Sequence, residues 1–159
     1  MFMEVYTAYL ASAIGPLEIS ASAEGITAVR FVSEAAAASD NLPPCLEDAL
    51  RQLAEYFAGR RTSFSLQLAP QGTPFQRRVW EKLGQIPFGQ TISYRELAAA
   101  LDKPQAVRAV GRANATNKLN IVVPCHRVIG ADGSLTGYGG GLERKEWLIS
   151  HERRVVSGC

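Results

Sequence analysis

Apolar and polar residues alternate in the first third of the chain, in a pattern typical of strands. Three short segments rich in β-branched and aromatic residues, separated by Gly-Pro and Glu-Gly turns, predict strands: residues 5–10, 17–21 and 26–32. A helix is expected next, because Pro43 and Pro44 open a stretch with apolar residues at helical spacing, and Gly59 ends it. Alternation over residues 64–68 predicts one more strand. These elements indicate a small sheet with one helix.

Beyond residue 72 the apolar spacing becomes helical. Thr73, followed by Pro74 and Gln76, gives the capping-box start of a helix that Gly84 ends. Residues 93–96 form a second capping box, and apolar residues at 97, 98 and 101 share one face of the helix that follows. A third helix is expected from about residue 104 to residue 114, after a break at residues 102–104.

This change of pattern places a domain boundary at residues 70–72. We predict an N-terminal α/β structural domain over residues 1–69 and a helical, winged-helix-like C-terminal domain over residues 70–159, so the fold class is α/β followed by α. The break at residues 102–104 joins two short helices, which is typical of a helix-turn-helix.

The second helix of this pair carries a basic face. Gln105, Arg108 and Arg112 are spaced to lie on one side of a helix, and the two like charges four residues apart mildly destabilise it in isolation. A polyanionic partner would offset that cost. Small residues, among them Ala106, permit the close approach of a DNA backbone or of a neighbouring helix. The alternative is an ordinary solvated helix face.

Composition adds limits to this picture. Hydrophobic residues make up 47% and charged residues 20% of the 159, which is ordinary for a folded chain with a core. No apolar run approaches the roughly 20 residues of a transmembrane helix, and the N-terminus lacks a basic leader. Cysteines at 45, 125 and 159 are odd in number and unpaired in spacing, which favours a reducing compartment. We therefore expect a cytoplasmic protein without a membrane partner.

The net charge of +2 hides an asymmetry between the halves of the chain. Residues 1–69 hold four Lys or Arg against eight Asp or Glu, and residues 70–159 hold thirteen against seven, so the halves carry −4 and +6. A basic half of this kind suggests that the C-terminal domain faces a polyanion, with scattered surface charge as the alternative.

The candidate chemistry lies between Asn117 and Gly130. An apolar run over residues 121–123 predicts a buried strand, and Pro124 ends its hydrogen bonding just before Cys125 and His126. A thiol beside an imidazole can form an activated nucleophile, because the thiolate is the reactive species. Adjacent side chains of an extended segment point to opposite faces, so His126 reaches Cys125 only if the backbone bends or a water bridges them. The alternative is a buried structural cysteine beside a histidine.

The segment Ile-Val-Val-Pro-Cys-His-Arg-Val-Ile at 121–129 closely resembles the active-site segment of the O6-alkylguanine-DNA alkyltransferases, also called methylated-DNA–protein-cysteine methyltransferases. The resemblance extends without an evident gap over about residues 73–152, and includes these segments: 75–80, 86–89, 93–94, 108–111, 133–142, 145–148 and 151–152. The N-terminal third resembles the family only in general layout.

The resemblance implies DNA repair by irreversible transfer of an alkyl group from O6-alkylguanine in double-stranded DNA, with O4-alkylthymine as a second lesion, to the protein's own cysteine. Residues 70–159 would form the DNA-binding and alkyltransferase domain of a monomer that needs no cofactor and acts once. Cys125 would be the nucleophile, His126 the base acting through a water, and Glu152 the group that orients the imidazole. Tyr94 would donate its hydroxyl proton toward N3 of the departing guanine. Asn117 would hold the turn before the active-site strand.

The resemblance also assigns DNA and pocket residues. Arg108 would fill the stack vacated by the extruded nucleotide, while Arg112 would contact phosphate. The remaining expected DNA contacts are Gln105, Ala106 and Tyr94. The expected pocket residues, some through their backbone groups and some as walls, are Val123, Pro124, Val128, Tyr138 and Gly139.

Two departures from the family pattern affect these expectations. Lys118 stands where the family often has proline and Asn120 where it sometimes has a second one, which bears on the rigidity and width of the pocket and so on its tolerance for larger alkyl groups. Some members hold zinc in the N-terminal domain, but here that domain has only Cys45 and no histidine, so we expect no metal site. Cys159 is expected to be exposed and incidental.

Two competing functions are weaker. A protein that binds the lesion without repairing it would resemble a family type that carries another residue, usually Trp, at the position of Cys125. A Cys-His hydrolase would need an oxyanion hole and a substrate groove, for which the sequence has no signal, and it would not explain the helix-turn-helix.

Overall fold

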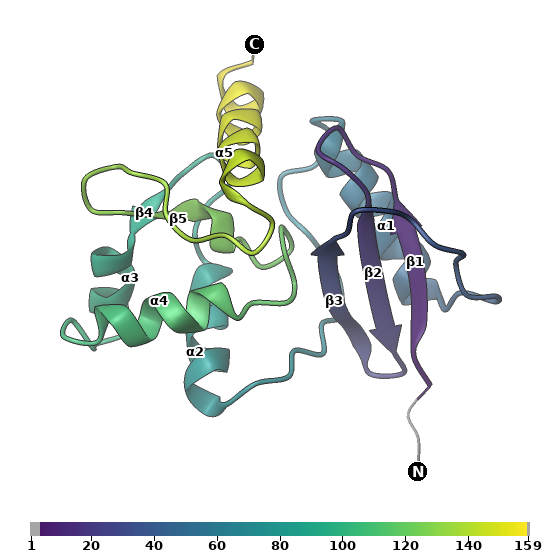
Figure 1. Ribbon diagram of the computed structural model, residues 1–159, viewed down its shortest axis with the longest axis horizontal. Helices are drawn as coiled ribbons and strands as arrows, with labels where there is room; N and C mark the ends of the chain where they lie inside the picture. The colour runs from purple at the N-terminus through teal and green to yellow at the C-terminus, as the bar shows by residue number, and fades with distance from the viewer. Residues whose placement is uncertain (1–3, 159) are drawn as a thin grey trace. The chain divides into compact units, whose positions relative to one another are not determined.

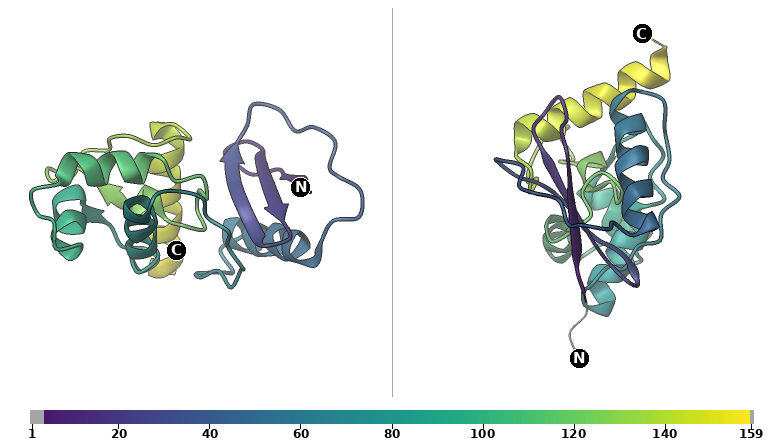
Figure 2. Two further views of the ribbon diagram at one scale, coloured as in Figure 1. Left: turned by 90° about the horizontal axis from the view of Figure 1, so that it is seen from below. Right: turned by 90° about the vertical axis from the view of Figure 1, so that its right-hand side faces the viewer.

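The computed structural model describes residues 4–158, which divide between Gln71 and Gly72 into two compact units. The first unit contains three strands, β1 (Tyr6–Leu10), β2 (Leu17–Ser22) and β3 (Gly25–Phe31), followed by the helix α1 (Pro44–Phe57). The strands form an antiparallel sheet in the order β1-β2-β3. Helix α1 lies along one face of this sheet (Figures 1 and 2). Cys159 lies outside the described residues.

The core of the first unit follows from the alternation in the sequence. Leu17 and Ile19 of β2 are fully buried, whereas Glu18 between them lies on the other face and pairs with Arg30 of β3. Leu46 and Leu53 of α1 complete the apolar layer. Burial of these alternate positions fixes the register of the sheet, because a shift by one residue would turn its apolar side outward.

The predicted strand at residues 64–68 is wrong. Within this segment only Leu68 pairs with the sheet, through a single parallel bridge to Ile26. The backbone of Ser65 is instead bound by the buried side chain of Gln52, which accepts from its N–H at 2.9 Å and donates to its carbonyl at 3.1 Å. A side chain therefore satisfies the backbone groups that a neighbouring strand would otherwise need.

The second unit is mainly helical. Its elements are α2 (Pro74–Leu83), β4 (Ile92–Ser93), α3 (Tyr94–Ala100), α4 (Val107–Ala115), the 3₁₀ turn η1 (Cys125–Arg127), β5 (Val128–Ile129) and α5 (Leu142–Ser157). Helices α2 and α3 both pack against α4 (Figure 1). Trp80 of α2 donates to the carbonyl of Ala113 at 2.9 Å. Strands β4 and β5 form a short parallel pair. The predicted fold class, a small sheet domain followed by a helical domain, is confirmed.

The helix-turn-helix consists of α3 and α4, but α4 begins later than the sequence predicts. Its first residue is Val107 rather than Pro104, and Ala106 is the N-cap, closing a turn by donating to the carbonyl of Lys103 at 2.9 Å. Gln105 therefore lies in this turn and does not share a helical face with Arg108 and Arg112. The turn closed between Lys103 and Ala106 occupies the place of the expected first helical turn.

The predicted strand at residues 121–123 is also wrong. Ile121 has a φ of 73°, which an extended strand does not allow. Val123 donates to the carbonyl of Leu119 at 2.9 Å and Val122 to that of Asn120 at 2.8 Å, so the backbone groups are used in tight local turns. The apolar side chains of this run are buried by a turn and not by a sheet.

No helix among residues 4–158 combines the length and the hydropathy that crossing a membrane requires.

The capping box of α3 generates a prediction about stability. The Ser93 hydroxyl accepts from the backbone N–H of Glu96, and the Glu96 carboxylate accepts from the N–H of Ser93. Ser93→Ala should lower the free energy of unfolding by about 1 kcal/mol, because one N–H of the first turn loses its acceptor. Urea unfolding of the purified variant measures this. Ser93→Asp, which keeps an acceptor, should remain near the wild type, and an equal loss in both variants would contradict a capping role.

Candidate active site

The backbone bends at Cys125, so the thiol and the imidazole sit on a tight turn rather than on a strand. The Cys125 N–H donates to the carbonyl of Val123 at 2.8 Å, and η1 begins at once. The buried side chain of Asn117 fastens the turn before it, donating to Val123 O at 2.9 Å and accepting from the N–H of Leu119 at 3.0 Å. Asn114 of α4 donates to the Cys125 carbonyl at 3.5 Å. Side-chain amides at and beyond the end of α4 therefore hold the loop that carries the thiol.

The thiol of Cys125 is buried and protonated at rest. Cys125 is 3% exposed, and burial raises the pKa of its thiol to about 11, although Asn117 and the positive charge of Lys145 act in the opposite direction. The Sγ of Cys125 donates to the Oδ1 of Asn120 at 3.9 Å. A neutral thiol is a weak nucleophile, so transfer to this sulfur requires a base.

His126 and Glu152 form a buried pair. The Nε2 of His126 lies 2.6 Å from the Oε2 of Glu152, and both side chains are 1% exposed or less. Arg127 adds two hydrogen bonds to the same carboxylate, Nε to Oε1 at 2.8 Å and a terminal nitrogen to Oε2 at 3.0 Å. The N–H of Gly89 donates to Oε1 at 3.1 Å. Glu152 therefore accepts hydrogen bonds from two separate segments, η1 and the loop of Gly89.

These contacts decide the charge states of the pair. Burial would raise the pKa of Glu152, but the hydrogen bonds and positive charges that face it outweigh burial and hold that pKa well below its usual range. Burial lowers the pKa of His126 below 6.5, against the pull of Glu152. At neutral pH the site therefore contains an ionised Glu152, with Arg127 as its counter-ion, and a neutral imidazole. No partner within the described residues engages the buried Nδ1 of that imidazole.

Tyr94 and Lys145 meet at one carbonyl of the loop before α5. The Tyr94 hydroxyl donates to Thr136 O at 3.0 Å, and Lys145 donates to the same oxygen at 2.7 Å. The Lys145 ammonium also lies 5.7 Å from the centre of the Tyr94 ring. Burial raises the pKa of the half-buried Tyr94 and lowers that of Lys145 to about 8. Lys145 thus remains mostly cationic at neutral pH.

Most of the residues expected at the site surround the thiol. Cys125, His126 and Glu152 lie in one buried cluster with Asn117, and Tyr94 is near enough to Cys125 for their charges to interact. The expected pocket residues divide by burial: Val123, Pro124 and Val128 are buried, Tyr138 is partly buried and interacts electrostatically with Cys125, and Gly139 is exposed.

The expected DNA-binding residues lie on and beside α4. Arg108 and Arg112 are both exposed, one helical turn apart on its surface. Ala106 is partly buried at the N-cap, and Gln105 is exposed in the preceding turn. Helix α4 therefore presents two cations outward while Asn114, on its buried side, contacts the loop of Cys125.

Three residues near the reactive cluster had no role predicted for them: Lys145, Arg127 and Asn114. A signal for the first was present, because Lys145 and Glu152 share one face of α5 with the apolar Leu148 and Ile149. Charged residues on a buried helical stripe must find partners, and here these are the loop carbonyl and Arg127. Nothing local in the sequence indicates which partners they are.

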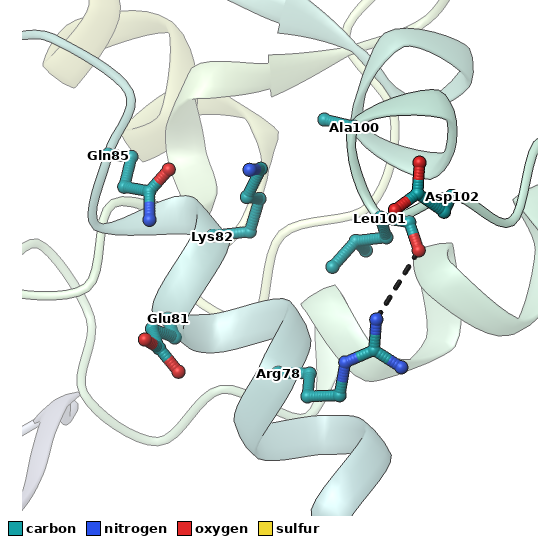
Figure 3. Close-up of a pocket in the computed structure, with 7 residues that line it drawn as sticks. All are labelled: Arg78, Glu81, Lys82, Gln85, Ala100, Leu101 and Asp102. Carbon is teal, nitrogen blue, oxygen red and sulfur yellow. Dashed lines mark hydrogen bonds between the residues drawn. The ribbon is translucent and has the colours of Figure 1, made fainter.

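A separate depression of about 280 Å³ lies between α2 and the end of α3 (Figure 3). Figure 3 shows the hydrogen bond that crosses it, from Arg78 to the carbonyl of Leu101 at 3.4 Å. Its other lining residues are Glu81, Lys82, Gln85, Ala100 and Asp102. It contains none of the residues of the cluster around Cys125.

Comparison with known proteins gives matches along both units. The family model described as "6-O-methylguanine DNA methyltransferase, ribonuclease-like domain" matches residues 5–70, and "6-O-methylguanine DNA methyltransferase, DNA binding domain" matches residues 74–154. The methylated-DNA–protein-cysteine methyltransferase of Methanosarcina barkeri is 43% identical over 153 residues, 93% of this chain and 97% of that protein. Its namesake from Mycolicibacterium paratuberculosis is 55% identical over 112 residues, 70% of this chain and 68% of that protein.

Solved structures agree with this. Mycobacterium tuberculosis O6-methylguanine methyltransferase aligns with a TM-score of 0.84 at 42% identity, covering 94% of this chain and 93% of its own. The complex of Mycobacterium tuberculosis OGT with DNA aligns with a TM-score of 0.83 at 43% identity, covering 92% of each chain. The resemblance seen in residues 73–152 is thereby confirmed, and the chain belongs to the methylated-DNA–protein-cysteine methyltransferase family.

Proposed function

We propose that this protein repairs DNA by moving an alkyl group from the O6 atom of guanine to the Sγ of Cys125, once per molecule. Family membership supports the reaction type, and one observation of the chain carries the assignment: the buried thiol of Cys125 is followed directly by a buried imidazole that is paired with Glu152 and that burial keeps neutral. A role in binding the lesion without repair is not favoured, because the relatives are named methyltransferases and Cys125 stands at the nucleophile position.

In the proposed reaction the thiol proton passes through a water to Nδ1 of His126. The Nε2–H of the imidazole donates to Glu152, so the charge that forms on the ring is stabilised by that carboxylate. The sulfur attacks the alkyl carbon in line with the breaking bond to O6. The thioether that forms has no low-barrier return path, and this makes the transfer stoichiometric.

The leaving guanine needs a proton, and we propose that Tyr94 supplies it at N3. In the absence of DNA the Tyr94 hydroxyl donates to Thr136 O, which Lys145 also binds. Turning that hydroxyl toward a guanine leaves the carbonyl of Thr136 hydrogen-bonded to the ammonium of Lys145, so the oxygen keeps a donor. The tyrosinate that results would lie beside the same positive charge.

We propose that α4 is the part of the protein that engages DNA. Exposed on α4, Arg108 would enter the stack as the target base swings out, and Arg112 would bind phosphate. Ala106 and Gln105 would lie close to the DNA backbone. Backbone groups at Val123, Cys125 and Val128 would read the guanine edge, with Pro124, Tyr138 and Gly139 lining the pocket. The chemistry uses residues of one chain and a reduced thiol, which supports a monomer acting in the cytoplasm.

Transfer to Cys125 can be tested directly. Incubation with duplex DNA that carries isotopically labelled O6-methylguanine should place one label per protein molecule on the Cys125 peptide, as read by mass analysis. Cys125→Ala should abolish transfer and leave DNA affinity nearly unchanged, because the buried thiol contacts no phosphate. Cys45→Ala is the matched control and should transfer normally. Label on Cys45 or Cys159, or many turnovers per molecule, would contradict the mechanism.

The charge state of His126 predicts how the rate of alkyl transfer falls at low pH. Only the neutral imidazole accepts a proton, and burial lowers its pKa below 6.5. The single-turnover rate with O6-benzylguanine should therefore hold as pH falls to 6.5 and then decrease about tenfold per unit below a lower midpoint. His126→Gln should be slow and lack this decrease. A wild-type midpoint above 6.5 would show that burial does not lower the pKa of His126 and would contradict this prediction.

Arg108 and Arg112 should differ in the step they affect. If Arg108 fills the space left by the base, Arg108→Ala should slow repair of duplex DNA at least about tenfold more than the reaction with free O6-benzylguanine, which requires no base flipping. Arg112→Ala should instead weaken binding evenly across sequences and reduce the salt slope by about one. Equal losses on duplex and free base would place Arg108 in the pocket chemistry rather than in flipping.

A further inference from the structure

Arg127 is a buried cation to which the proposed transfer gives no task. Its side chain is 8% exposed, and it belongs to η1, directly after Cys125 and His126. Beyond its two bonds to Glu152, its Nη1 donates to the carbonyl of Ile86 at 2.7 Å, and its guanidinium lies 5.6 Å from the centre of the Phe88 ring. The guanidinium of Arg127 is thus hydrogen-bonded both to Glu152 and to the carbonyl of Ile86.

Arg127 binds both oxygens of the Glu152 carboxylate, and each oxygen also has another partner. Oε1 accepts from Arg127 and Gly89, and Oε2 accepts from Arg127 and His126. A planar guanidinium bound to both oxygens sets the plane of the carboxylate, and with it the direction from which Oε2 meets the imidazole. The orientation of His126 is therefore coupled to Arg127 through one rigid group.

The bond between Arg127 and Glu152 also affects the protonation state of the His126 imidazole. A buried carboxylate whose only neighbour is a histidine draws a proton onto the ring, and an imidazolium cannot accept the proton of a thiol. Arg127 stays charged at any pH the protein meets, so it neutralises Glu152 without involving the ring. Nε2 can then keep its proton toward Oε2, while Nδ1 remains an acceptor.

We propose that Arg127 is a positioning residue for alkyl transfer: by its two-point bond to Glu152 it holds His126 in the Nε2–H tautomer and adds to the burial that keeps the ring neutral, with Nδ1 available to the thiol proton. This inference rests on the function proposed above for Cys125 and His126. Arg127 thus acts on the base, His126, and does not itself touch the reacting atoms.

Other charged groups near the ring do not replace this effect. From α5, Glu152 favours the protonated ring and Lys145 disfavours it, while Arg127 disfavours it from η1. Cys125 is uncharged at rest. Lys145 donates to the carbonyls of Thr136 and Gly137, not to Glu152. Among these groups, only Arg127 both cancels the carboxylate charge and binds its two oxygens.

The test is the titration of His126 in the full chain carrying Arg127→Gln. The protein has two histidines, so ¹⁵N-histidine spectra contain two sets of ring signals, and a His151→Gln variant assigns them. The His126 midpoint should rise by about one pH unit or more, and transfer to O6-benzylguanine should become about tenfold slower for each unit of that rise at pH values below the midpoint. At alkaline pH the rate should return toward that of the wild type. Arg60→Gln, which removes an exposed arginine of the first unit, is the charge-matched control.

The outcomes separate the possibilities. A wild-type midpoint in Arg127→Gln, or a rate loss equal at every pH, overturns the proposal, since a merely structural role predicts the latter. If the wild type itself transfers nothing to Cys125, the proposed function fails, while the ring titration still reports whether Arg127 controls His126.

A second variant keeps the proposal testable if Arg127→Gln does not fold. Arg127→Lys keeps the charge but cannot bind both carboxylate oxygens in one plane. A mixed population of ring tautomers together with slower transfer supports the proposal. A wild-type tautomer together with a wild-type rate overturns it.

Discussion

The ionised carboxylate of Glu152 is the constraint on which the second unit depends. A buried charge is tolerated only when it is paired and hydrogen-bonded, and Glu152 meets this condition with donors from the 3₁₀ turn of Cys125 and from Gly89. Arg127, one of these donors, is itself held by the carbonyl of Ile86, which accepts from its Nη1. Segments far apart in the chain must therefore come together around one side chain of α5. Removing any donor would leave part of the charge unpaired.

Helix α5 also carries a second buried charge that is held by hydrogen bonds. Lys145 lies two turns before Glu152 on the same face, and it binds the loop carbonyl that also receives the Tyr94 hydroxyl. One helix thus supplies a positive side chain that binds the loop of Thr136 and a negative side chain that binds the turn of Cys125. In between, burial keeps the thiol protonated at rest, so the nucleophile stays inactive until a proton acceptor is used.

Local chemistry explains which elements the sequence predicts well. Both capping boxes, at Thr73 and Ser93, start helices where expected, because Ser, Thr, Gln and Glu satisfy the first-turn N–H groups without distant partners. Prediction failed where a distant or irregular contact replaced a backbone partner. Gln52 binds the segment expected to be a strand, and Asn117 helps to fold residues 119–123 into turns despite their apolar composition.

The sequence by itself determined the order of sheet and helices, the helix-turn-helix and the family, and it singled out Cys125 beside His126 through a run of residue types too specific to be shared by chance. Only the tertiary structure determined the protonation states and the orientations of those residues. Burial sets the protonation of Cys125 and His126, and Arg127 acts on the imidazole only because α5 brings Glu152 between them. Desolvation and long-range pairing depend on which segments meet in space, and spacing along the chain does not specify that.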